Sequence, residues 1–244
     1  MPFTISHTVA VIPLFRLRRL DPLALVIGSM APDFGYFLNL FPMAGTAHSL
    51  VGSFTTALPL ALLVWCLCRS FADFLMRPLP GRLRSVAGSL LERRPWTCWT
   101  PLWIIASFLL GIWSHNLLDA FTHKTGWAVQ RLPLLHDPWP LYHILQQLGS
   151  VIGLLILAAI YWRRRGHSSS PPLHRDPRLL TLLGIALLGL LIAILPAWNF
   201  AERFHGYAFV RAFRYRWIVH IMAFASCGYL ILALWLRLRM RRSP

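Results

Sequence analysis

Three residues near the end of one apolar segment carry side chains that commonly bind metal ions. His115, Asp119 and His123 follow one another at intervals of four residues. On an α-helix, residues i, i+4 and i+8 lie close to one face, so these side chains can point the same way. Imidazole and carboxylate groups bind divalent metals, and a carboxylate within a membrane span is costly unless it is paired or coordinated. The spacing therefore predicts a metal site.

Three more residues of these types, His7, Asp33 and His48, lie beside apolar segments nearer the N-terminus. We expect a divalent metal, with zinc preferred, because zinc takes nitrogen and oxygen ligands and lowers the pKa of a bound water toward about 7. The two aspartates serve as ligands, or one of them as general base. One metal with a spare carboxylate and two metals with a bridging carboxylate both remain open. The candidate ligands are His7, Asp33, His48, His115, Asp119 and His123.

Three polar residues, Gln146, Gln147 and Ser150, open the third long apolar segment. They can hydrogen-bond the metal ligands or touch a substrate, and hydrogen bonding between helices is the alternative. The chain has no phosphate-binding glycine loop, no Gly-x-Ser-x-Gly motif and no Cys/His nucleophilic pair. A metal site is therefore the chemistry that the sequence favours.

The composition indicates that membrane helices must position these residues. The 244 residues are 57% hydrophobic and 13% charged, whereas soluble domains carry roughly a quarter charged residues. Five apolar stretches are long enough to cross about 30 Å of hydrocarbon with about twenty residues each. These stretches cover residues 49–67, 99–121, 141–162, 179–198 and 217–236. We predict an all-α, polytopic helical membrane protein.

The arginines predict how the spans are oriented. The net charge is +16, and most basic residues follow the first span, the third span or the last span. The positive-inside rule places these segments in the cytoplasm, and their charge favours membrane lipids as partners over nucleic acid. We therefore expect a multi-pass protein of the inner (cytoplasmic) membrane with its polar site toward the outer face. Residues 199–216 mix four arginines with aromatic residues, which we interpret as an amphipathic helix on the outer interface.

The first 48 residues predict a short helical hairpin. Residues 5–15 are apolar but too short to span, and Asp21-Pro22 is typical of an N-cap followed by proline in the first helical turn. A hairpin returns His7 and Asp33 to one face, whereas a full span over residues 23–40 would separate His7 from the other candidates. We expect a single integral domain over 1–244, with the hairpin at 1–48, core spans at 49–162, and two further spans with a basic tail at 163–244.

Four short motifs carry a resemblance to a known family. They are residues 1–7 (MPFTISH), 28–34 (GSMAPDF), 47–49 (AHS) and 114–123 (SHNLLDAFTH). Over roughly residues 1–155, the chain resembles a bacterial membrane family catalogued as domain of unknown function 4184. Gln147, Ser150 and Gly153 also fit this family's pattern. A polar residue such as His often follows the glutamine, but Leu148 stands there, so no ligand is carried over.

More distantly, the order of motifs is similar to that of inner-membrane metal-dependent hydrolases related to a LexA-binding protein. The matching positions are His7, Pro32-Asp33, His48-Ser49, His115, Asp119, Thr122 and Gly126. This resemblance implies a metal-dependent hydrolase. That family usually has a second acid two residues after its Pro-Asp motif, and Gly35 stands there, which weakens a two-metal reading.

The sequence leads to three alternatives for function. The first is a membrane-embedded, metal-dependent hydrolase of an ester or phosphoester, with a lipid-like substrate. The second is a transporter of a small solute or ion, although such folds tend to show inverted repeats and broken helices in both halves, and this sequence shows neither. The third is a non-catalytic membrane scaffold whose polar cluster locks helices together. Whether the chain is an enzyme stays open at this point.

Overall fold

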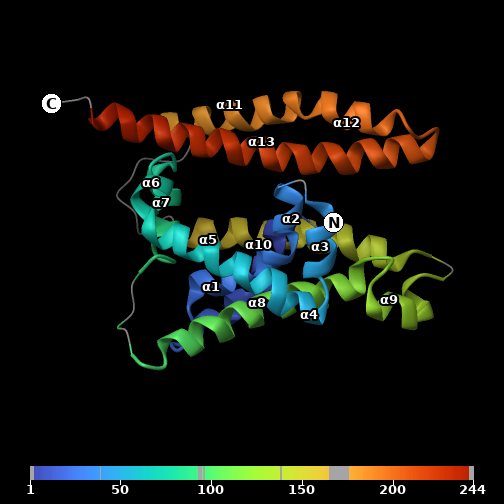
Figure 1. Ribbon diagram of the computed structural model, residues 1–244, viewed down its shortest axis with the longest axis horizontal. Coiled ribbons are helices and arrows are strands. Elements are labelled where there is room, and N and C mark those ends of the chain that lie inside the picture. Colours follow the sequence, from blue (N-terminus) through green and yellow to red (C-terminus); the bar gives the residue numbers. More distant parts are fainter. Residues whose placement is uncertain are drawn as a thin grey trace. The chain divides into compact units, whose positions relative to one another are not determined.

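The computed structural model describes residues 3–38, 40–92, 95, 97–137, 139–164 and 176–241, and no strand occurs among these residues. Within this part of the chain, five helices are long and apolar enough to cross a membrane. The chain is an all-α, polytopic helical membrane protein with an N-terminal helical hairpin (Figure 1). The predicted fold class is confirmed.

The five spans coincide with the five apolar stretches because a segment in lipid must satisfy its backbone groups internally, as a helix does. The first combines α4 (Leu50–Gly52), the π-helix η3 (Ser53–Ala57) and α5 (Leu58–Ser70). The second combines α8 (Thr100–Thr122) with α9 (Trp127–Arg131). The others are α10 (Leu141–Arg164), α11 (Pro177–Ile192) with α12 (Ile194–Ala201), and α13 (Tyr207–Arg241).

The chain divides into two compact units. The first contains Met1–Phe34, Pro42–Arg69 and Leu90–Gly166, and the second contains Gly35–Phe41, Ser70–Ser89 and His167–Pro244. The shorter helices are α2 (Phe34–Phe37), α3 (Phe41–Ala47), α6 (Ala72–Met76), α7 (Gly81–Gly88) and the 3-10 helix η4 (Pro133–Leu135). A single integral domain over 1–244 stays a prediction.

The hairpin in the first unit pairs the 3-10 helix η1 (Thr4–Arg16) with α1 (Pro22–Met30). A 3-10 helix rises about 2.0 Å per residue, so η1 extends about 26 Å, where an α-helix of 13 residues would extend about 20 Å. Asp21 caps α1 by accepting from the Ala24 N–H, and its other oxygen lies 2.7 Å from the Arg69 guanidinium. Since Arg69 is near the end of the first span, the hairpin turn lies at the opposite end of that span from His48.

Helix α1 packs closely on α8 through two glycines. A Cβ at Gly28 would lie 2.5 Å from the Phe108 carbonyl oxygen, and a Cβ at Gly111 would lie 2.6 Å from the Leu25 carbonyl oxygen. Small residues allow membrane helices to approach in this way. The close approach brings the backbone of α1 next to the side chains of α8 and so prepares the site described below.

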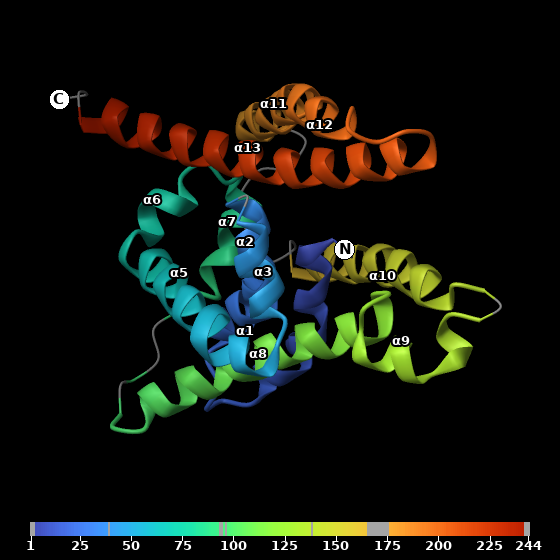
Figure 2. The same ribbon diagram turned by 45° about the vertical axis from the view of Figure 1, so that its right-hand side comes forward.

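In the second unit, α11 and α12 pack against α13 (Figure 2). Helix α13 is continuous for 35 residues, or about 52 Å, which exceeds the thickness of the hydrocarbon. Residues 207–216 do form a helix, but it is the beginning of α13 and not the separate interfacial helix that we expected. The chain turns at Gly206, whose φ is +57°, and no residue between it and Trp217 interrupts the helix.

Candidate metal centre

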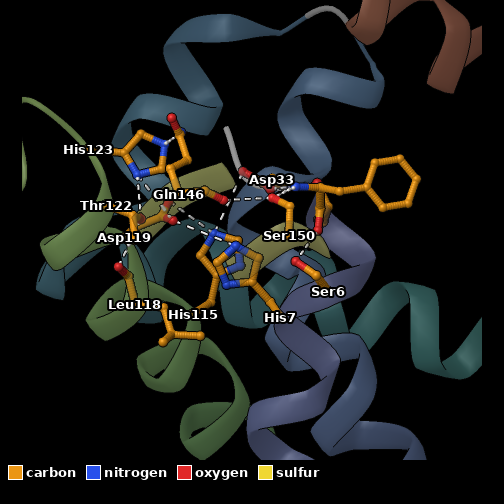
Figure 3. Close-up of polar contacts among 12 residues, drawn as sticks. Ser6, His7, Asp33, His115, Leu118, Asp119, Thr122, His123, Gln146 and Ser150 are labelled. Carbon is orange, nitrogen blue, oxygen red and sulfur yellow. Dashed lines mark hydrogen bonds and ion pairs between the residues drawn. The ribbon is translucent and has the colours of Figure 1, made fainter. Parts of the chain in front are cut away.

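The structure brings all six predicted ligands together within the first unit. They come from four places: His7 from η1, Asp33 from the 3-10 helix η2 (Ala31–Asp33), His48 from the residue after α3, and the remaining three from α8 and its end. Figure 3 shows His7, Asp33, His115, Asp119 and His123 around one another. The N-terminal 48 residues and the second span therefore build the cluster jointly.

Four of these side chains place one atom each in a closely spaced set. The atoms are His48 Nε2, His115 Nε2, Asp33 Oδ1 and Asp119 Oδ2. The two nitrogens lie 3.3 Å apart, and His48 Nε2 lies 3.4 Å from Asp33 Oδ1. Asp119 Oδ2 lies 3.3 Å from His48 Nε2 and 3.4 Å from His115 Nε2. The Asp33 oxygen lies 3.7 Å from His115 Nε2.

These distances match the ligand separations of a tetrahedral zinc site for each carboxylate oxygen taken with the two imidazole nitrogens. Bonds of about 2.0–2.1 Å in tetrahedral geometry separate the ligand atoms by about 3.3 Å. The five distances measured between the four atoms lie between 3.3 and 3.7 Å. The donor set of two imidazoles and two carboxylates is one that zinc accepts. The residues present thus fit a divalent metal.

Backbone carbonyls orient the two imidazoles. His115 Nδ1 lies 2.8 Å from the Ser29 carbonyl oxygen, and His48 Nδ1 lies 2.7 Å from the Ala44 carbonyl oxygen. Because a carbonyl oxygen only accepts, each Nδ1 donates its hydrogen, and each Nε2 faces the carboxylates. Metal-binding histidines typically donate their other N–H to a carbonyl or carboxylate in this manner.

The two carboxylates are held differently. Asp33 Oδ2 accepts a hydrogen bond of 2.7 Å from the Thr4 hydroxyl, which leaves Oδ1 facing the imidazoles. Asp119 Oδ1 faces the other way, 3.2 Å from His123 Nδ1 and 3.7 Å from His7 Nε2. Asp33 is therefore fixed by a neutral donor, whereas Asp119 connects the four-atom set with the two remaining histidines.

His7 is buried without a hydrogen bond to either ring nitrogen from the described residues. Its side chain is 2% exposed, and its ring stacks on that of His115 at a centroid distance of 4.0 Å. A buried polar group without a partner costs about 1–3 kcal/mol. A cation or a water among these groups would satisfy the ring.

The charge of the cluster favours a cation. In the described part of the chain, the ion-pair partners of Asp33 and Asp119 are histidines. His48 precedes the first span. Burial lowers the pKa of His48, but the carboxylates of Asp119 and Asp33 outweigh burial and raise that pKa to about 10. The negative charges of the Asp33 and Asp119 carboxylates can be balanced by protons on the imidazoles. A metal ion that replaces these protons can balance them equally.

The structure separates the three polar residues predicted beside the ligands. Gln146 is buried, and its Nε2 lies 3.3 Å from His123 Nε2. The Ser150 hydroxyl accepts from the Phe3 N–H at 3.1 Å and donates to the Gln146 carbonyl at 2.9 Å, so it holds the start of the chain. Gln147 is exposed and is not brought to the cluster. Adjacent residues of a helix point in different directions, which explains the difference.

Sequence reasoning missed Thr4 and the carbonyls of Ser29 and Ala44. Residues i and i+3 of a 3-10 helix lie one above the other, so Thr4 follows from His7 once the helix type is known. A 13-residue 3-10 helix is uncommon, and the sequence predicts a helical hairpin there without a helix type. The carbonyls belong to the backbone, so no residue type marks them.

Comparison with known proteins supports the resemblance noted above. Residues 1–238 match the model of a family described as "Domain of unknown function (DUF4184)". No curated protein matches the chain, and no solved structure does. The predicted resemblance to this family is confirmed and extends through both C-terminal spans. The more distant similarity to LexA-binding-type hydrolases stays a prediction.

Proposed function

The chain belongs to the DUF4184 family, and we propose that it is a membrane-embedded, metal-dependent hydrolase that cleaves an ester or phosphoester bond in a lipid-like substrate. The observation that supports this most strongly is the 3.3–3.7 Å spacing between the Nε2 atoms of His48 and His115 and one oxygen each of Asp33 and Asp119. The resemblance to inner-membrane metal-dependent hydrolases points to the same reaction class.

These four side chains would hold the ion, and zinc suits their ligand types best. A zinc ion with four protein ligands would take a water by expanding to five-coordinate. When bound, the ion would lower the pKa of a water toward about 7 and polarise the oxygen of the bond to be cleaved. Asp33 would stay a ligand, because the Thr4 hydroxyl fixes its second oxygen. Asp119 is the general base in this proposal, because its Oδ1 is not one of the four atoms and accepts no hydrogen bond from the described residues.

The proposed reaction needs only water and the substrate. The hydroxyl of water goes to the carbonyl carbon or the phosphorus, and the bond from that atom to the leaving oxygen breaks. Asp119 takes the other proton of water and passes it to the leaving oxygen. An acid and an alcohol result, and the carboxylate is restored.

We place the chain in the inner (cytoplasmic) membrane, in contact with lipids, with its site toward the outer face. His48 lies just before the first span and is 3.3 Å from His115, in the last third of α8, so these ends of the two spans are on one side. Arg69 is near the opposite end of the first span. The positive-inside rule assigns that end to the cytoplasm.

Elemental analysis of detergent-purified protein tests the metal. We expect about one equivalent of zinc in the wild type and none in His115→Ala, because His115 touches three of the other proposed ligands. His136→Ala is the matched control, because His136 is exposed in the loop before α10. Lipid esters and phosphoesters are then the substrates to assay.

A protein that takes up no metal, after purification without chelators and an attempt at reloading, would contradict the proposal. If such a metal-free protein unfolds in His115→Ala combined with Asp119→Ala, the scaffold alternative is favoured, because that alternative makes the polar cluster hold the helices together. Full metal in His115→Ala alone would show that the ion is held elsewhere.

A further inference from the structure

A groove of about 230 Å³ lies between η1, α8 and α10 in the first unit, and His7 forms part of its wall. Its polar lining residues are Ser6, His7, Thr122 and Gln146. Its apolar lining residues are Val9, Ala10, Leu118, Leu145, Ile152 and Ile156. The polar lining residues of η1, α8 and α10 lie near the ends of these helices that are close to the six candidate ligands. The groove is therefore almost wholly apolar, and its few polar side chains lie near the cluster.

Two glycines of α10 face this region and serve different purposes. A Cβ at Gly153 would lie 2.6 Å from the Ser6 Cβ, so this glycine lets η1 pack against α10. A Cβ at Gly149 would meet nothing within 4 Å. Packing therefore does not require a glycine at position 149, and its missing side chain keeps the groove open.

The length of the groove matches the depth of one lipid leaflet. From Leu145 to Ile156, α10 advances about 16 Å, and half of the hydrocarbon core measures about 15 Å. The lining residues belong to two spans and the hairpin, and Leu118 and Ile152 are 41% and 51% exposed. In a membrane-spanning helix, such apolar side chains face acyl chains and not water.

We propose that this groove binds a single acyl chain of a lipid, with the bond that joins the chain to its head group beside Ser6, His7 and Gln146. His7 Nε2 lies 3.7 Å from Asp119 Oδ1, so that bond would lie next to the proposed general base. The identification of this lipid as the substrate rests on the proposed hydrolase. The binding of the acyl chain does not, because it depends only on the groove.

Photolabelling in lipid nanodiscs with a palmitic acid that carries a diazirine tests the binding. Mass spectrometry of the labelled peptides should show label concentrated between Leu145 and Ile156. Leu180 and Leu187 of α11 are 72% and 58% exposed and provide an internal reference for general lipid contact. We expect Gly149→Leu to lower labelling of the groove about tenfold, since the new side chain displaces several methylenes from it.

Gly184→Leu is the matched control, because a Cβ at Gly184 in α11 also meets nothing within 4 Å and the residue does not line the groove. Gly149→Ala, which adds a single carbon, should give a partial loss and a folded protein. Equal labelling of the groove and α11 in the wild type, or unchanged groove labelling in both Gly149 variants, would overturn the inference. Zinc content should be the same in wild type, Gly149→Leu and Gly184→Leu. If none of the three proteins contains zinc, the proposed hydrolase is contradicted, whereas acyl-chain binding in the groove is not.

Discussion

Asp21 and Asp119 are both acids of the first unit, at opposite ends of its helices, and they have different partners. Asp21 lies 2.7 Å from the Arg69 guanidinium, caps α1, and accepts from the Trp65 indole N–H at 3.3 Å. Asp119 lies near four histidines and no arginine or lysine among the described residues. Both side chains are mostly buried, with 13% and 11% exposure.

The difference separates a structural acid from a candidate binding acid. Arginine keeps its charge at all physiological pH values, so Asp21 is neutralised permanently and a cation has little to gain there. Imidazoles bind metals through a nitrogen that has lost its proton, so the partners of Asp119 can give up protons in favour of an ion. The type of the partner, and not the burial of the acid, distinguishes the two sites.

Asp119→Asn should have the largest effect of the substitutions that test this comparison. Loss of a ligand carboxylate should lower zinc affinity more than about a hundredfold, because changes to residues that merely support ligands already cost 10–100-fold. Zinc titration of the purified variant measures this. Asp137→Asn, in an exposed loop, should bind as the wild type does. Stoichiometric zinc in Asp119→Asn would remove Asp119 from the ligand set.

Asp21→Asn should leave zinc binding unchanged and lower the free energy of unfolding by about 3 kcal/mol, because Arg69 keeps its charge and loses its partner. Asparagine caps helices as well as aspartate does, so the change isolates the ion pair. Denaturant unfolding followed by circular dichroism measures the loss. Asp73→Asn, at an exposed position, should change stability by less than about 0.5 kcal/mol. Equal stability of both variants would contradict a structural role for Asp21.

Thr4→Val should have the smallest effect, a loss of about tenfold in zinc affinity, because Asp33 loses the hydroxyl that orients its carboxylate. Isothermal titration with zinc measures the change. Thr8→Val is the control, since the Thr8 hydroxyl donates to the Ile5 carbonyl within η1 and not to a ligand. Equal affinities in the two variants would show that Asp33 is oriented without Thr4.

The five spans and the convergence of the six candidate ligands followed from the sequence because they depend on apolar length and on loop charge, which the sequence contains. Apolar length predicts a helix in lipid, and the charges of the loops predict which span ends share a face. His115 and Asp119 lie on one face of α8 for the reason that the spacing implied. His123 comes one residue after the end of α8 and still reaches Asp119 at 3.2 Å.

Other features depend on contacts between distant segments, and the sequence could not supply them. The orientation of His48 comes from the Ala44 carbonyl, and that of His115 from the Ser29 carbonyl of another helix. The exposed position of Gln147 depends on which face of α10 meets η1. The continuity of α13 was missed because its charged first turns resemble an interfacial helix when they are read alone.

The distribution of the ligands along the chain has a consequence for biosynthesis. His7 is made early, whereas Asp119 and His123 are made about halfway through translation. Because synthesis proceeds from the N-terminus, the four-atom set cannot form until the hairpin and both of the first two spans have entered the bilayer. Capture of an ion would thus report that insertion of the first unit is complete, and a chain arrested before residue 119 would remain without a site.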